Sequence, residues 1–199
     1  DNLAAFAFSG MGAKVTSVDI SEQRLDVASK HAKQLDLPIK FLRADAADLS
    51  LIGDSEFDLV FSSNGFFVWI ANLQAVFSEI YRILRPGGHY AFYDIHPFLR
   101  PWKDQTTPIE VAKPYWQTEP MEDEEGGAFE FHWTLADILN SLATSGLILR
   151  RVLESPAKDS RFWQDYSYLP GTDDSLLDWK ENPRAALPVW LTLALQRPV

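Results

Sequence analysis

The chain has 199 residues, with 28 acidic against 18 basic side chains and a formal net charge of −10. A molecule with this much negative charge and no run of Lys or Arg would repel a polyphosphate. No nucleic-acid partner is therefore expected. No stretch reaches the about 20 apolar residues of a membrane-spanning helix, so no membrane partner is expected either. Cysteine is absent, which excludes disulfides and thiolate metal sites and suits a reducing cytoplasm.

Strands and helices are predicted to alternate through the first half of the chain. After a first helix that ends at Gly10, the predicted strands cover 13–20, 39–43, 57–62 and 89–95, and helices cover 22–35 and 73–84. The strand over 57–62 is almost continuously apolar, as expected of a strand covered on both faces. This alternation predicts an α/β fold with a doubly wound, mostly parallel sheet, which binds ligands at the carboxyl ends of its strands.

The second half begins with an irregular stretch. Residues 97–131 are rich in proline and aromatic side chains, and so long a loop inside a compact domain is usually functional. We interpret it as an insert that caps the substrate site of a single domain over 1–199. Thr134 with Asp137 resembles a capping box that starts the next helix. Strands over 147–154 and 189–196 close the chain.

Four segments carry a family resemblance: VTSVDIS, FLRADAADL, FDLVFSSNGFFVWI and EIYRILRPGGHYAFYD. Their order and spacing resemble the class I S-adenosylmethionine-dependent methyltransferases of the UbiE-like (methyltransferase type 11) family. The resemblance covers about residues 1–96 and 132–197. It implies a Rossmann-like methyltransferase fold with an antiparallel last strand, and S-adenosyl-L-methionine as the cofactor.

The resemblance also implies a set of cofactor residues. Asp19 ends its strand where an acid can accept both ribose hydroxyls, and Asp45 resembles the acid that accepts from the adenine amino group. The remaining candidates lie beside these acids or at the mouth of the central strand: Ile20, Ala46, Ser62, Ser63 and Asn64. The alternatives are a surface or capping acid at Asp19 and local turns at Asp45 and Asn64.

One element of the family pattern is absent. Its first strand ends in a Gly-rich loop that approaches the cofactor, and nothing in this sequence supplies such a loop. The Gly10-Met11-Gly12 segment precedes a strand, whereas a binding loop must follow one. We therefore expect an N-terminally incomplete fold that lacks an upstream strand and loop, with a break in the sheet beside the 57–62 strand.

Methyl transfer from a sulfonium depends mainly on positioning, and a general base helps if the acceptor is a hydroxyl or an ammonium. Val68 stands where many relatives have a histidine, so any base must come from elsewhere. His96 and His132 are the candidate catalytic residues, and both could instead be structural hydrogen-bonding groups. Their spacing from acidic residues matches no metal-ligand motif.

Aromatic residues suggest where an acceptor binds. The candidates for substrate contacts are Tyr93, Trp102, Trp116 and Trp133. Together with Tyr115, Phe129 and Phe131 they could line an apolar or cationic acceptor pocket, or form a satellite cluster that holds the long loop down. The expected function is S-adenosylmethionine-dependent methylation of a small molecule; the alternative is an inactive binding or regulatory protein with the same fold.

Overall fold

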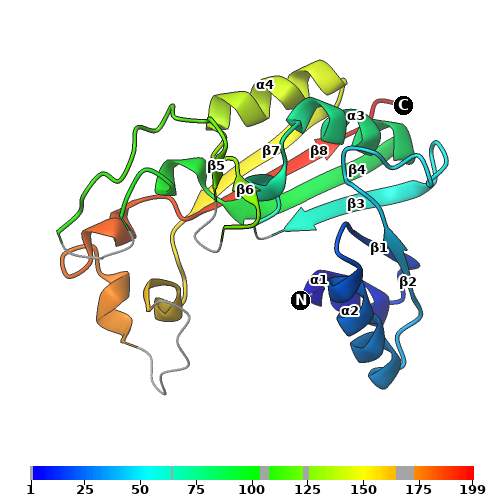
Figure 1. Ribbon diagram of the computed structural model, residues 1–199, viewed down its shortest axis with the longest axis horizontal. Helices are drawn as coiled ribbons and strands as arrows, with labels where there is room; N and C mark the ends of the chain where they lie inside the picture. The colour runs from blue at the N-terminus through cyan, green and yellow to red at the C-terminus, as the bar shows by residue number, and fades with distance from the viewer. Residues whose placement is uncertain (1, 64, 104–107, 123–125, 165–172) are drawn as a thin grey trace.

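The computed structural model describes residues 2–63, 65–103, 108–122, 126–164 and 173–199 (Figure 1). Its N-terminal part alternates helices and strands: α1 (Leu3–Gly10), β1 (Val15–Asp19), α2 (Glu22–Gln34) and β2 (Ile39–Arg43). The central part contains β3 (Phe57–Ser63), η1 (Phe67–Trp69), α3 (Leu73–Ile83), β4 (Leu84–Ile95) and η2 (Pro97–Leu99). The C-terminal part contains β5 (Met121–Glu122), β6 (Phe129–Glu130), α4 (Leu135–Ser145), β7 (Ile148–Ser155) and β8 (Trp190–Gln196), with short 3-10 turns between β7 and β8.

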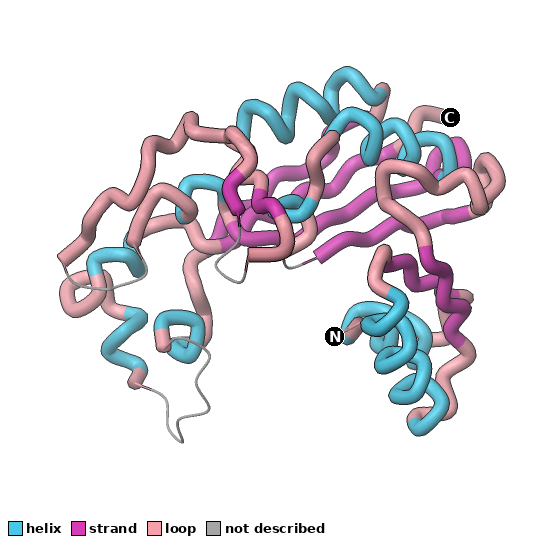
Figure 2. Tube along the Cα trace, viewed as in Figure 1, coloured by secondary structure: helices cyan, strands magenta, loops and turns pink. Residues whose placement is uncertain are grey.

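The described strands form three sheets (Figure 2). β1 and β2 pair in parallel, the larger sheet has the order β3-β4-β8-β7, and the short strands β5 and β6 form an antiparallel pair. β3 and β4 are parallel, and β8 runs antiparallel to both of its neighbours. These pairings confirm the predicted α/β sheet with an antiparallel last strand.

The expected break beside β3 is present. β1 and β3 belong to different sheets, and the two parts meet through side chains instead, such as Phe8 of α1 and Phe61 of β3, whose ring centroids are 5.5 Å apart. Leu59 and Phe61 of β3 are 44% and 37% exposed. The prediction that this strand is covered on both faces is therefore wrong for its Leu59 face.

The boundary between α3 and β4 also differs from the sequence prediction. β4 begins at Leu84 and runs through Pro86-Gly87-Gly88, whereas the predicted strand began at His89. The pairing with β3 jumps from Leu84 to His89, so the Pro-Gly-Gly segment bulges out of the ladder. Gly87 has a φ of 80°, a conformation that favours glycine, and this explains how the strand continues through the bulge.

The main core lies between the larger sheet and the helices α3 and α4, which cover its upper face in Figure 1. Fully or almost fully buried side chains come from all of these elements, including Val76, Phe77, Tyr90, Leu142 and Leu193. The core holds the carboxyl ends of β3 and β4 next to the start of α4. It therefore fixes the geometry of the region where ligands bind in such sheets.

The start of α4 offers a test of this packing. Thr134 Oγ1 accepts the Asp137 N–H at 3.1 Å and the Asp137 carboxylate accepts the Thr134 N–H at 2.9 Å, which is the predicted capping box. Thr134→Ala should lower the free energy of unfolding by about 1 kcal/mol, measured by urea denaturation. Thr134→Ser keeps the accepting oxygen and should lose clearly less; an equal loss in both variants would contradict a capping role.

Candidate functional site

Two carboxylates lie at neighbouring strand ends. Asp19 ends β1 and pairs in register with Arg43 of β2, so Asp45 follows at the same edge of the pair. One oxygen of Asp19 accepts the Ser21 N–H and one oxygen of Asp45 accepts the Ala47 N–H, both at 2.8 Å. The second oxygen of each carboxylate accepts no hydrogen bond from the residues that the structure describes. Both acids are thus oriented by a turn and retain an acceptor for a ligand.

The neighbouring candidates differ in what they can offer. Ile20 is 64% exposed beside Asp19, whereas Ala46 packs against the main core. At the end of β3 the Ser62 hydroxyl lies 2.8 Å from the Tyr90 hydroxyl, so its side chain faces the core, and Ser63 is exposed. Asn64 lies outside the described residues.

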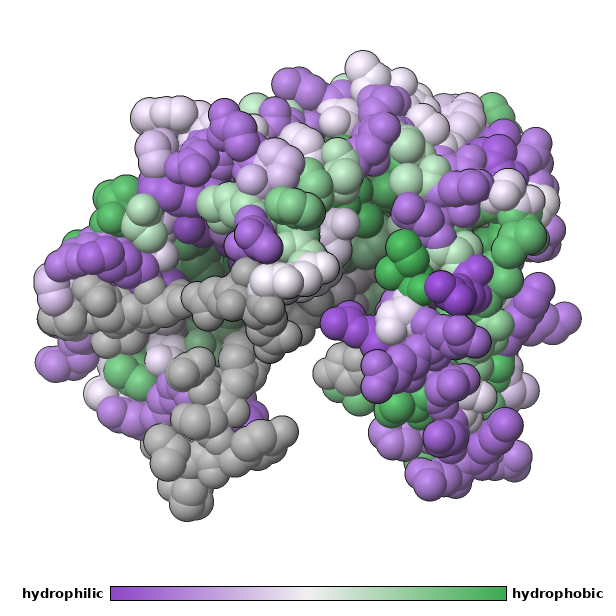
Figure 3. Space-filling model, in the orientation of Figure 1, coloured by the Kyte–Doolittle hydropathy of each residue, from purple (hydrophilic) through white to green (hydrophobic). Residues whose placement is uncertain are grey.

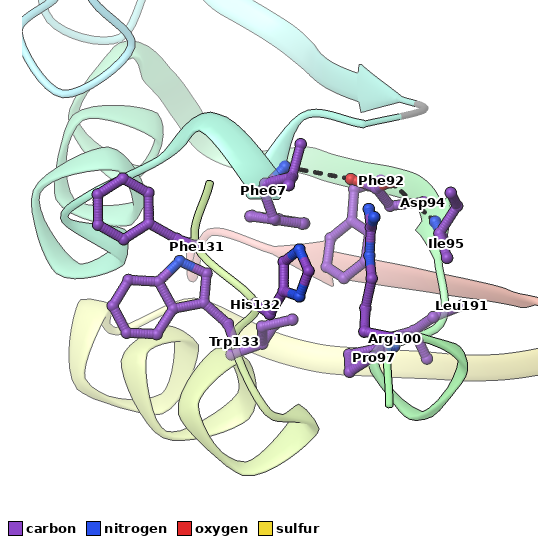
Figure 4. Close-up of a pocket in the computed structure, with 12 residues that line it drawn as sticks. Phe67, Phe92, Asp94, Ile95, Pro97, Arg100, Phe131, His132, Trp133 and Leu191 are labelled. Atoms are coloured by element: carbon purple, nitrogen blue, oxygen red, sulfur yellow. Dashed lines mark hydrogen bonds between the residues drawn. The ribbon is translucent and has the colours of Figure 1, made fainter. Parts of the chain in front are cut away.

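Asp94, near the end of β4, is a buried carboxylate with four hydrogen-bond donors. Its Oδ1 accepts the N–H groups of Gly65 and Ile95, both at 2.7 Å, and Oδ2 accepts those of Phe66 and Phe67 at 3.0 and 3.2 Å. Burial of a charge is costly unless hydrogen bonds replace the lost water, and here four backbone donors do so. Asp94 therefore fixes the loop after β3 against the end of β4 (Figure 4).

His132 lies beside this loop, in a cavity of about 20 Å³ that Asp94, Arg100 and Trp133 also line (Figure 4). Its Nε2 is 2.9 Å from a Glu130 oxygen, while its buried Nδ1 has no hydrogen-bond partner among the described residues. Since a carboxylate only accepts, the contact assigns the proton to Nε2 and leaves the Nδ1 lone pair free.

The environment keeps His132 neutral. Burial lowers the pKa of the imidazole most strongly, the hydrogen bond that it donates to Glu130 opposes this shift, and the positive charges of Arg100 and Lys113 lower the pKa further. A neutral imidazole with a free ring nitrogen is the form that can accept a proton.

His96 is placed differently. Its Nδ1 accepts the Phe98 N–H at 3.0 Å and its Nε2 lies 2.8 Å from a Glu154 oxygen, so both ring nitrogens are engaged. Burial lowers its pKa although Glu154 opposes the shift. The geometry is that of a buried residue that starts the η2 turn.

The four aromatic candidates occupy three places. Trp133 lines the His132 cavity, and its indole N–H donates to the Ile70 carbonyl at 2.9 Å. Trp102 and Trp116 line a separate groove of about 500 Å³. Tyr93 lies on the other face of β4, stacked on Trp190 with ring centroids 4.7 Å apart. The structure therefore does not bring Tyr93 together with the others.

The sequence patterns do not predict two of these features. An acidic residue at the end of an otherwise apolar strand, such as Asp94, is nevertheless a usable signal. The contributions of Arg100 and Lys113 depend on how the 97–131 segment folds, which carries no period in the sequence. Among the described residues no group of three His, Asp or Glu side chains could hold a metal ion, and no helix there is long and apolar enough to span a membrane.

Comparisons with known proteins agree with this geometry. Residues 2–92 match a family model described as a methyltransferase domain. A demethylmenaquinone methyltransferase of Leptospira interrogans is 35% identical over 91 residues, 44% of this chain and 36% of that protein. A malonyl-[acyl-carrier protein] O-methyltransferase of Enterobacter lignolyticus is 37% identical over 81 residues, 41% of this chain and 30% of that protein. The match spans about a third of the length of these relatives.

A solved structure extends the likeness beyond the matched segment. An S-adenosylmethionine-dependent methyltransferase from Mesorhizobium loti aligns with a TM-score of 0.66 and 21% identity, over 92% of this chain and 80% of that one. At this identity the likeness is one of fold. It includes the second half of the chain, which the family model leaves out.

The role of Asp94 can be measured. Asp94→Asn turns an NH2 group toward backbone donors, and should lower the free energy of unfolding by about 2–3 kcal/mol because a charged acceptor is lost in a buried site. The matched control is Asp58→Asn, which removes an exposed ion pair with Arg85 and should cost under about 1 kcal/mol. Urea denaturation gives both values; equal losses would show that Asp94 does not organise the loop.

The two buried histidines predict a pH dependence. Because folding lowers the pKa of His96 and of His132, the unfolded chain binds protons more readily at these sites. The free energy of unfolding should therefore fall as the pH drops from about 6.5, the ordinary histidine value, through the folded-state pKa. NMR titration should show both residues titrating below about 6.5, with His132 protonated on Nε2. A proton on Nδ1 of His132 would contradict the assigned tautomer.

Proposed function

We propose, because the chain belongs to the class I S-adenosylmethionine-dependent methyltransferases, that the protein binds S-adenosylmethionine at the ends of β1, β2 and β3 and methylates a small molecule. The observation that carries the proposal is the pair of strand-end acids. Asp19 and Asp45 each keep one free carboxylate oxygen at the edge where such sheets bind nucleotides.

The residues present fit the cofactor. The free oxygen of Asp19 suits a ribose hydroxyl, and that of Asp45 suits the adenine amino group, since carboxylates are strong acceptors. Exposed Ile20 can cover the adenine ring, and Ala46 leaves room beside Asp45. Ser62 takes part through its backbone, because its hydroxyl already meets Tyr90. Ser63, the last residue of β3, and Asn64, which follows it in the sequence, complete the proposed set of cofactor residues.

The bound cofactor supplies an electrophilic methyl group on a sulfonium. The chain supplies positioning and, in our proposal, a base at His132. Its Nδ1 is unpartnered among the described residues, and Glu130 holds its Nε2. For a hydroxyl or ammonium acceptor, Nδ1 accepts the proton that the acceptor loses, and Glu130 stabilises the resulting imidazolium. We assign His96 a positioning role, because both of its nitrogens are engaged.

Two further parts of the proposal concern architecture. We propose that the open edges of β1 and β3 receive another strand of the natural protein, which carries the Gly-rich loop of the family, because unpaired strand edges are normally filled or covered. We also propose that the 97–131 segment caps the acceptor site. The end of this segment already contacts the loop after β3, since the Phe131 N–H donates to the Val68 carbonyl at 2.8 Å.

Cofactor binding tests the proposal. Asp19→Ala should weaken S-adenosylmethionine binding to the natural protein at least tenfold, or about 1.4 kcal/mol, because a charged acceptor for the ribose is lost. Calorimetry gives both affinities. Asp48→Ala is the matched control: its carboxylate lies in the loop after β2 and accepts the Ser50 N–H, and its loss should leave the affinity unchanged.

Turnover separates catalysis from binding alone. Formation of S-adenosylhomocysteine with a panel of small acceptors would support the enzyme. Tight cofactor binding without turnover on any acceptor would instead favour the inactive binding or regulatory protein. An unchanged affinity in Asp19→Ala would remove Asp19 from the site and with it the observation on which the proposal depends.

A further inference from the structure

We infer that the acceptor is an amphipathic anion, with an apolar body in the groove of Trp102 and Trp116 and a negative group held between Arg100 and Lys113. The inference deepens the proposed function, since it names the class of molecule that the acceptor site takes. It depends on three observations: the size and lining of the groove, the two cations Arg100 and Lys113, and the His132 cavity, which Arg100 lines.

The groove has the size and lining of a ligand site. Its volume of about 500 Å³ lies within the roughly 300–1,000 Å³ typical of small-molecule sites. Its lining is mainly apolar and aromatic: Phe98, Pro101, Trp102, Val111, Tyr115 and Trp116. In Figure 3 hydrophobic residues reach the surface at the left of the view, where Figure 1 places this part of the chain.

Hydrogen bonds fix two of the aromatic side chains that line the groove. The Trp102 indole N–H donates to the Phe98 carbonyl at 2.8 Å, and the Tyr115 hydroxyl accepts the Leu135 N–H at 2.8 Å. Trp116, however, is 78% exposed and Val111 is 60% exposed. A ligand with an apolar body would cover these two side chains and gain the free energy of their burial.

Two positive side chains lie where the groove and the His132 cavity come together along the chain. Lys113 lines the groove, and Arg100, directly before Pro101 of the groove wall, points into the His132 cavity (Figure 4). The Lys113 N–H donates to the Pro101 carbonyl at 3.2 Å, which places Lys113 beside the residue that follows Arg100, and its Nζ donates to the Gln117 carbonyl at 2.8 Å. Burial lowers the pKa of Lys113 most, and the charge of Arg100 lowers it further. Neither forms an ion pair within the part of the chain that the structure describes.

Two of the acidic groups nearby are engaged by hydrogen bonds, and a third, Glu119, acts on Lys113 through its charge. Asp94 accepts four backbone N–H groups, and Glu130 is held by His132. Glu119 and Glu130 favour the charged form of Lys113, but their effects on its pKa are smaller than those of burial and of Arg100. Two like charges held together favour a bound anion. The inference therefore differs from the cationic acceptor that the aromatic residues alone suggest.

The arrangement also sets where the acceptor reacts. The His132 cavity, at about 20 Å³, has room for one small group next to the free Nδ1. An acceptor anchored by its apolar body and its negative group would place a substituent there. Specificity would then come from the groove and the cation pair, while His132 acts on the group that enters the cavity.

Binding of three matched probes tests the inference without the cofactor. The probes are 1-naphthylacetate, its uncharged amide and the cation 1-naphthylmethylammonium, with affinities measured by calorimetry at neutral pH. The acid should bind at least about tenfold more tightly than the amide, and the cation most weakly. Arg100→Gln and Lys113→Gln should each reduce the preference for the acid, while Trp116→Ala should weaken acid and amide by the same factor.

Lys158→Gln, at an exposed lysine outside the groove, is the charge-matched control and should leave the preference unchanged. Equal binding of acid and amide, tightest binding of the cation, or binding of none of the probes would overturn the inference. S-adenosylmethionine affinity is measured on the same samples. A preference for the acid without cofactor binding would contradict the proposed function alone, and cofactor binding without the preference would contradict this inference alone.

Discussion

A buried carboxylate organises the region where the proposed acceptor site lies. Asp94 is 4% exposed and its oxygens accept four backbone N–H groups, three of them from Gly65, Phe66 and Phe67. The loop after β3 is thereby fixed to the end of β4. The carbonyl of Val68, the next residue of that loop, accepts the Phe131 N–H. Phe131 directly precedes His132 in the chain. One side chain thus connects the sheet to the candidate base.

In the proposed function the two halves of the chain have different roles. The ends of β1 and β2 present acids whose free oxygens can accept from a nucleoside, and these acids depend only on local turns. The acceptor side depends on contacts between distant segments: β4, the 97–131 segment and the start of α4. A family can therefore keep the first half and change acceptors through the second, as expected where loops on a rigid scaffold carry specificity.

The sequence predicted local elements better than contacts between distant segments, for a physical reason. Strand ends such as Asp19 and capping residues such as Thr134 follow from local periodicity and turn chemistry, and the structure has them where they were expected. The engagement of both His96 nitrogens and the isolation of Tyr93 on the opposite face depend on tertiary packing. The sequence likewise does not predict that Arg100 and Lys113 lie near each other, because no pattern of residues fixes how an aperiodic insert folds.

We propose that cofactor and acceptor are recognised by separate parts of the molecule. NMR titration of the natural protein with S-adenosylhomocysteine tests this most directly. We expect shifts of the backbone amides around Asp19 and Asp45, with the indole N–H signals of Trp102 and Trp116 unmoved. Shifts at the two indoles without any at the strand-end acids would contradict it.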